Sequence, residues 1–258
     1  MFFISTDKLH KTRGIVLRTV KYGETSVIVS IFTELFGVQS YLVNGVRTSS
    51  KKGSGKANLF QPTAILDMVV YHSELKQLQR IKEFRWGYIY NHIFSDVRRN
   101  SVSLYMIELL TKCLRQPEPN PELFEFSQDA FTTLDDCTDA VLANFPLFFA
   151  LHLPVFFGFR ISPPKPFLVE DESGQLFLDL EEGEFVPVQP QHPHFLEGKP
   201  AYIVSLLLKA QQPGELAEIK LNHEFRRNLL FAMERFYALH IQDFASMRTL
   251  PVLREILG

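Results

Sequence analysis

Hydrophobic and polar positions divide the chain into two parts with different periods. Between residues 12 and 86, short runs rich in Val, Ile, Thr and aromatic residues alternate with turn residues, a pattern typical of β-strands. The runs are residues 12–20, 25–33, 38–46, 63–71 and 78–86. Since the first run is apolar on both faces, we expect a closed or doubly covered sheet. Five such strands predict a small barrel.

After Trp86 the apolar residues recur at helical spacing, which predicts a mostly helical part. Asn120 can cap one helix, and Pro121 suits its first position. The expected helices are residues 100–114, a helix from 121, and residues 138–157, 201–211 and 222–242. Before the last two of these helices, a proline-rich segment carries two β-like runs, residues 166–169 and 175–180. We expect a β-hairpin insert at about residues 160–200.

Composition excludes two classes of protein. With 46% hydrophobic and 22% charged residues, the chain is typical of a folded globule rather than a disordered one. Its most apolar stretch, residues 145–159, is broken by Pro146 and Pro154, and the N-terminus has too short an apolar run for a signal peptide. We therefore expect no membrane span and a cytoplasmic location. Cys113 and Cys137 are expected to be reduced and packed rather than joined in a disulfide.

Charge is distributed unevenly along the chain, although its net value is only -2. Residues 1–82 hold eight Lys and four Arg against five acidic side chains, a net charge of +7. The remaining residues have a net charge of -9. Such asymmetry indicates a polyanion partner for the basic part, and we divide the chain into domains at 1–82 and 83–258.

The strongest candidate for binding chemistry is the basic loop at residues 47–56. It combines four positive charges with serines and glycines, so it can follow phosphate groups without requiring one geometry. Further cations lie on the predicted strands, and Tyr22, Phe36, Tyr41 and Tyr71 are candidate platforms for stacking bases. The complete predicted nucleic-acid site is Lys11, Arg13, Arg18, Lys21, Arg47, Lys51, Lys52, Lys56, Lys76, Arg80 and Lys82.

Two alternatives from other classes remain open. Asp135, Asp136 and Asp139 can be grouped as Mg²⁺ ligands of a nuclease or phosphotransferase, although acidic residues before a helix are more often caps. A basic barrel can also serve as a scaffold that binds an acidic protein. A zinc site at His192 and His194 is disfavoured because the loop has no cysteine.

Four motifs in the first part resemble a known family. They are TRGIVL at residues 12–17, YGETS at 22–26, IFTELFG at 31–37 and YLVNGVR at 41–47. Together with the segments 236–240 and 250–257, they resemble the bacterial recombination mediator family RecO over nearly the whole chain. The resemblance implies an α+β fold: an N-terminal five-stranded OB-fold β-barrel followed by a mostly helical domain with the hairpin insert.

The resemblance also implies a non-catalytic DNA repair protein. Family members bind single- and double-stranded DNA, anneal complementary strands, work with RecR, and help RecA replace single-strand-binding protein (SSB). Many carry a four-cysteine zinc module where this chain has no cysteine, so we expect no metal and no cofactor here. For the acidic tail of SSB we expect an Arg-rimmed apolar groove, with Arg226 and Arg227 at its rim. The expected location is cytoplasmic and nucleoid-associated.

Overall fold

The computed structural model describes residues 8–46, 56–166, 168 and 176–256. The chain forms two compact units. The first comprises residues 1–91 and 114–132, and the second comprises residues 92–113 and 133–258. The first unit is therefore larger than the predicted 1–82 domain. It extends to residue 91 and also includes most of the helix α3 (Pro121–Asp136).

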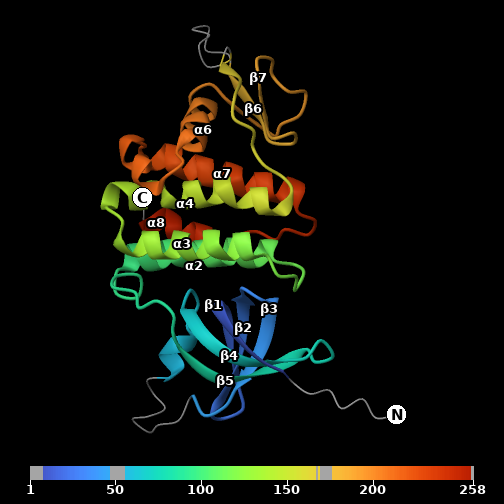
Figure 1. The fold of residues 1–258 in the computed structure, drawn as a ribbon. Coiled ribbons are helices and arrows are strands. Elements are labelled where there is room, and N and C mark those ends of the chain that lie inside the picture. Colours follow the sequence, from blue (N-terminus) through green and yellow to red (C-terminus); the bar gives the residue numbers. More distant parts are fainter. Residues whose placement is uncertain (1–7, 47–55, 167, 169–175, 257–258) are drawn as a thin grey trace. The chain divides into compact units, whose positions relative to one another are not determined.

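The first unit is built on a closed five-stranded barrel (Figure 1). Its strands are β1 (Lys8–Tyr22), β2 (Ser26–Thr33), β3 (Gly37–Val43), β4 (Ile65–His72) and β5 (Leu78–Trp86). They pair in the order β1-β2-β3-β5-β4, and β1 also pairs with β4. All pairs are antiparallel except β3 with β5. This confirms the predicted five-stranded, OB-like barrel.

Strand β1 takes part in two ladders because it is long and irregular. Its register with β2 shifts between Val16 and Arg18, which makes Leu17 the extra residue of a bulge and bends the strand. Ile15 and Val16 are consecutive, yet both are fully buried. The backbone of Val16 hydrogen-bonds the chain before β4, from Val16 N to Ala64 O at 2.9 Å and from Thr63 N to Val16 O at 2.8 Å. These bonds extend the antiparallel pairing of β1 with β4 beyond the pair Ile15–Ile65.

The turn between β2 and β3 is held by a threonine and a glycine. Thr33 Oγ1 donates to Gly37 O at 2.8 Å and accepts from Phe36 N at 3.1 Å. Gly37 has φ +61°, and a Cβ at this position would lie 2.2 Å from Glu118 O. Only glycine combines that dihedral angle with so close an approach to a backbone.

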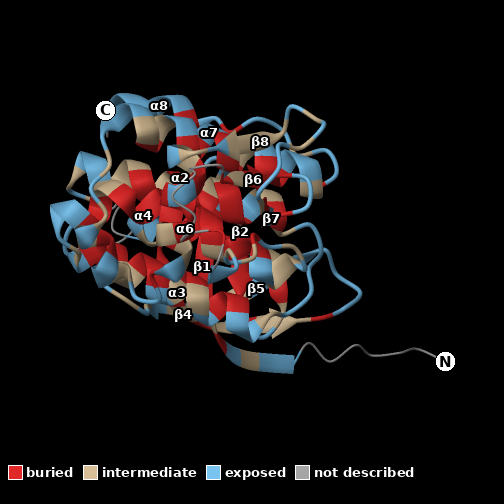
Figure 2. Cartoon of the chain, turned by 90° about the horizontal axis from the view of Figure 1, so that it is seen from above, coloured by how far each residue is buried: buried red, intermediate tan, exposed pale blue. Residues whose placement is uncertain are grey.

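Helix α4 (Asp139–His152) lies at the centre of the second unit. Within that unit it contacts α2 (Val97–Cys113), η2 (Leu153–Phe157), α6 (Lys199–Lys209), η3 (Pro213–Glu218) and α7 (His223–His240). Its residues from Val141 to Leu151 are nearly all buried (Figure 2). The segment Asp139–Phe157 is long and apolar enough to span a membrane, but most of it is buried inside the protein. Such burial is typical of a core helix, and it agrees with the core role predicted for residues 138–157.

A buried polar network joins α4 to two later segments. Asn144 Nδ2 donates to Leu216 O at 3.2 Å and to Ile219 O at 2.7 Å. Arg226 in α7 donates from Nε to Asn144 Oδ1 at 3.4 Å and from Nη2 to Leu221 O at 3.1 Å. Burying these groups is tolerated because each has a partner.

The structure differs from the sequence prediction in two places. The insert contains a hairpin, β6 (Phe177–Asp179) with β7 (Glu184–Val186), but a third strand that was not predicted, β8 (Phe195–Glu197), pairs with β6 to give the sheet order β7-β6-β8. Residues 166 and 168 are helical, so the described part of the β-like run predicted at 166–169 is wrong. Apolar side chains hold this sheet, because Leu176 and Phe185 are buried and Phe177 is half-buried.

A last helix, α8 (Thr249–Ile256), was not predicted. Its start is capped by Glu108 of α2, which accepts hydrogen bonds from Arg248 N and Thr249 N, both at 2.8 Å, and from Thr249 Oγ1 at 2.6 Å. A carboxylate at this position satisfies N–H groups that have no partner within the helix. Cys113 and Cys137 are both free thiols, as predicted.

Replacing Gly37 with alanine should destabilise the protein more than the same change at Gly45. Both glycines have positive φ, +61° and +68°, so each substitution costs about 1 kcal/mol of backbone strain. Only at Gly37 does the new Cβ also collide with a backbone, which should add about 1–3 kcal/mol. Urea unfolding of the two variants measures the difference. Equal destabilisation would show that residues 117–118 move aside freely.

Candidate nucleic-acid interface

The outer face of the barrel can be read from the strand register. Cross-strand partners point to the same face of a sheet, and β2 alternates between buried and half-buried residues. Arg18 is opposite Ser30, and Ser30 is opposite Ser40. These three residues therefore form one outward row across β1, β2 and β3. Arg18 is exposed.

A second outward row lies two residues further along β1, β2 and β3 and continues across β5 and β4. Val20 is paired with Ile28, Ile28 with Leu42, Leu42 with Arg80, and Arg80 with Tyr71. Ile28, Leu42 and Tyr71 are half-buried, and Val20 and Arg80 are exposed. An apolar row that includes a tyrosine and an arginine is suited to stacked bases and their phosphates. We call the two rows together, from Arg18 to Tyr71, the β2–β3 face.

Two turns flank the β2–β3 face with further cations. Lys21 and Tyr22 lie at the end of β1, and both are exposed. Lys76 is exposed in the turn between β4 and β5. In OB-folds these two loops and the face of strands 2 and 3 are the usual oligonucleotide site.

Four members of the predicted site come from the loop between β3 and β4. Arg47, Lys51 and Lys52 lie outside the described residues. Lys56 is described and exposed, close before η1 (Asn58–Phe60). Among the described residues, neither Lys56 nor Arg18, Lys21 or Arg80 has an acidic partner within ion-pair distance. These cations are therefore available to phosphates.

The structure places Lys11 and Arg13 on a different stretch of the barrel, formed by β1, β4 and β5. Here a cleft of about 580 Å³ is lined by equal numbers of cations and carboxylates. The charged lining residues are Lys11, Arg13, Arg85, Glu34, Asp67 and Glu83. Arg85 pairs with Asp67 at 3.0 Å. This cleft is balanced in charge, unlike the β2–β3 face.

Arg13 is held in place by its neighbours. Its Nη2 and Nε lie 2.8 Å and 3.0 Å from the two carboxylate oxygens of Glu34, and its Nη1 donates to Gln128 Oε1 at 3.0 Å. The guanidinium also lies 5.2 Å from the ring centroid of Phe124. The hydrogen bond with Glu34 raises the pKa of Arg13, and the hydrogen bond with Arg13 lowers the pKa of Glu34. These contacts favour a structural role for Arg13.

Lys82 sits at an irregularity of β5. Glu83 pairs with Val69 and Ile81 with Val70, so Lys82 is the extra residue of a bulge. Simple alternation would place Arg80 and Lys82 on one face of β5, but it does not hold across this bulge. Both side chains are exposed, and Lys82 Nζ lies 3.8 Å from Glu83 Oε1.

The four candidate stacking residues have different surroundings. Tyr41 is fully buried, and burial raises its pKa, so the idea that it stacks on bases is wrong. Phe36 already stacks on His72, with ring centroids 3.9 Å apart. Tyr71 lies on the β2–β3 face. Tyr22 lies at the end of β1, before the turn to β2, and is 53% exposed. These two tyrosines remain as candidate platforms.

The predicted partner residues Arg226 and Arg227 line a small hollow between α7 and α8. Its apolar lining consists of Leu230, Phe231, Leu250 and Leu253, and its polar lining consists of His223, Arg226, Arg227 and Arg254. Arg226 is 7% exposed and bound to Asn144, and burial lowers its pKa. Arg254 is exposed and Arg227 half-buried. Arg254 was not predicted as a partner-binding residue, because α8 was not among the predicted helices.

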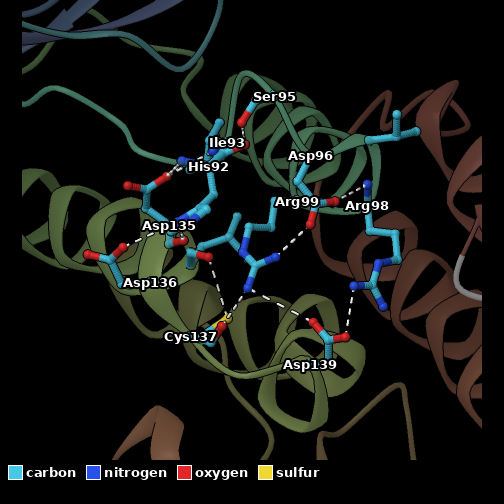
Figure 3. A network of polar contacts seen from close by, with 12 residues as sticks. His92, Ile93, Ser95, Asp96, Arg98, Arg99, Asp135, Asp136, Cys137 and Asp139 are labelled. Atoms are coloured by element: carbon cyan, nitrogen blue, oxygen red, sulfur yellow. Dashed lines mark hydrogen bonds and ion pairs between the residues drawn. The ribbon is translucent and has the colours of Figure 1, made fainter.

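The acidic segment 135–139 does not form the predicted three-carboxylate cluster (Figure 3). Asp139 pairs with Arg98 at 2.8 Å and lies in the first turn of α4. Thr138 caps that helix by accepting from Val141 N. Asp135 instead lies within 4.8 Å of Asp136 and His92. The structure thus supports the capping role for the start of α4.

The histidines of the insert are bound to carboxylates. His192 Nε2 lies 3.1 Å from Asp179 Oδ2, and its Nδ1 lies 3.6 Å from Glu181 Oε1. His194 Nε2 is 3.9 Å from the same Glu181 oxygen. Because the two ring nitrogens of His192 face different carboxylates, these groups do not converge on one point.

Comparison with known proteins gives matches to both parts of the chain. Residues 8–90 match the family model "Recombination protein O N terminal", and residues 95–248 match "Recombination protein O C terminal". The DNA repair protein RecO of Phocaeicola vulgatus is 32% identical over 251 residues, which cover 97% of this chain and all of that protein. The RecO proteins of Bacteroides fragilis and Christiangramia forsetii are 32% and 29% identical, with 96% of this chain covered in each case and 99% and 98% of those proteins. The chain therefore belongs to the RecO family of DNA repair proteins.

Proposed function

We propose that this protein is a recombination mediator that binds single- and double-stranded DNA, anneals complementary strands and, with RecR, assists RecA loading onto SSB-coated DNA. The observation that carries the proposal is the β2–β3 face, where Arg18 and Arg80 flank half-buried apolar residues. Its DNA contacts would be made by Arg18, Lys21, Lys56, Lys76 and Arg80, with the basic loop at 47–55 as an extension. The family's role as repair mediators rather than enzymes, together with the separation of Asp139 from Asp135 and Asp136, supports a physical mechanism.

In this mechanism, the exposed cations neutralise phosphates and release their counterions. Lower repulsion between two bound strands then allows them to pair. Tyr71 and the apolar residues beside it hold bases by stacking without selecting a sequence. The protein would act in the cytoplasm, where its substrate is chromosomal DNA.

The hollow between α7 and α8 supports an acidic peptide as the second ligand. A peptide of this kind, such as the tail of SSB, would place an apolar end against Phe231, which is 42% exposed, and its carboxylates near Arg227 and Arg254. Arg226 would stabilise the helix that lines the hollow rather than bind the peptide, because its guanidinium donates to Asn144 and to the carbonyl of Leu221.

The DNA proposal predicts a specific change in salt dependence. Replacing both Arg18 and Arg80 with alanine should weaken single-stranded DNA binding. It should also lower the slope of log K against log salt by about 0.7 for each phosphate that the variant no longer neutralises. Fluorescence titrations of a labelled oligonucleotide at several salt concentrations measure the slope.

The matched control is Arg85→Ala. Arg85 is also exposed on the barrel, but it is paired with Asp67 in the charge-balanced cleft. Its removal should leave the slope almost unchanged. If Arg85→Ala reduced the slope as much as the double variant, DNA would not be bound by the β2–β3 face.

For the second ligand, we predict that Arg227→Ala combined with Arg254→Ala weakens binding of an acidic peptide with an apolar C-terminal end at least fivefold. Each charge-assisted contact is worth about 1.5–3 kcal/mol when fully formed, and less at an exposed rim. Isothermal titration calorimetry with the intact protein gives the affinity.

Two further variants separate this role from a structural one. Arg235→Ala removes an exposed arginine of the same helix that does not line the hollow, and it should leave peptide affinity unchanged. Arg226→Ala should lower the melting temperature, since Asn144 loses a buried partner. Unchanged affinity in the Arg227 and Arg254 double variant would contradict the assignment of the hollow.

A further inference from the structure

Three side chains outside the proposed DNA and peptide sites converge at the end of α3 (Pro121–Asp136). One ring nitrogen of His92 and one carboxylate oxygen each of Asp135 and Asp136 lie within 4.8 Å of one another. His92 comes from the turn that follows the barrel, and the two aspartates form the end of the helix (Figure 3). We propose that these three residues bind a divalent ion of the first transition series, such as Zn²⁺.

The distances within the cluster match those of a coordination shell. His92 Nδ1 lies 3.3 Å from Asp136 Oδ1 and 2.9 Å from the main-chain oxygen of Asp135. Neighbouring donors are about 3.0 Å apart around an octahedral ion with bonds of about 2.1 Å, and about 3.3 Å apart around a tetrahedral ion with bonds of about 2.0 Å. An ion bound by His92 Nδ1, Asp136 Oδ1 and the main-chain oxygen of Asp135 therefore requires little rearrangement. The Asp135 carboxylate oxygen, within 4.8 Å of the other two side-chain donors, would move closer to complete the site.

The donor types select the class of metal. An imidazole nitrogen with carboxylate and carbonyl oxygens suits Zn²⁺ and its first-row neighbours, whereas Mg²⁺ prefers oxygen ligands and retains its waters. When Nδ1 is the metal ligand, the ring proton is on Nε2. The ion would thus take the place of the proton that Nδ1 otherwise donates to the main-chain oxygen of Asp135, 2.9 Å away.

The position of the aspartates adds an electrostatic reason. Two carboxylates in the last turn of a helix face its negative end, which is unfavourable, and the last turn of α3 contains no basic residue. Asp135 is fully buried and is oriented by hydrogen bonds from His92 N and Ile93 N to its Oδ1, both 2.8 Å long. His92 and Asp136 are exposed, so an ion can enter from solvent.

The ion would tie two segments that are distant in sequence. His92 is the first residue of the second unit after the chain leaves residues 1–91, and Asp135 follows shortly after the chain returns to that unit at residue 133. A bound metal would therefore fix the end of α3 to the turn at residues 92–96. The role we assign to it is structural, and it is independent of DNA binding.

The test is a titration of the metal-free intact protein with Zn²⁺, followed by calorimetry and by thermal unfolding. We expect one equivalent to bind with micromolar or tighter affinity and to raise the melting temperature. His92→Gln and Asp136→Asn should each weaken binding at least tenfold. The matched control is His192→Gln with His194→Gln, which removes two other histidines near carboxylates and should leave the affinity unchanged.

A second measurement does not depend on the variants. Mn²⁺ added to the ¹⁵N-labelled wild-type protein should broaden the amide signals of residues 92–95 and 134–137 before all others. The proposal is overturned if Zn²⁺ does not bind, if binding persists in both His92→Gln and Asp136→Asn, or if Mn²⁺ broadens a different region first.

Discussion

The barrel depends on a short parallel ladder in which Ser40, Tyr41 and Leu42 pair with Leu78, Gln79 and Arg80. All other strand pairs of the barrel are antiparallel and longer. Without this ladder, β3 and β5 would be the two edges of an open sheet with unpaired backbone groups. Closure also places Arg80 and the turn before β5 beside the outer surface of β3. The β2–β3 face is thus a consequence of how the barrel closes.

Much of the fold could be predicted from the sequence because its elements have strong local patterns. The five strands are short, rich in β-branched residues and separated by turns, and α4 is so apolar that its central position follows from composition. Helix α8 is not evident from the sequence, since Pro251 disfavours a helix interior. Proline is tolerated there because it lies in the first turn, where the N–H has no intrahelical partner anyway, and Glu108, a residue distant in sequence, supplies the cap.

The candidate site was less predictable because it depends on register. Arg13 and Arg18 are five residues apart, so simple alternation would place them on opposite faces of β1. The bulge at Leu17 resets the alternation, and both point outward. Their roles then diverge through their neighbours, since Arg13 meets Glu34 and Gln128 whereas Arg18 lies beside Ser30. A count of basic residues cannot reveal that difference.

The local contacts of the carboxylates also explain much of the acidic excess after residue 82. Several carboxylates there accept hydrogen bonds from backbone N–H groups at the starts of helices and turns. They are Asp96 with Arg98 N, Glu108 with Thr249 N, Asp135 with Ile93 N, Asp179 with Glu181 N, Glu215 with Gln212 N and Glu234 with Met247 N. An ionised acceptor strengthens such bonds, so these charges have a structural cause. The negative charge of this part is therefore weak evidence for a docking partner, whereas the cations on the β2–β3 face have no acidic partner among the described residues.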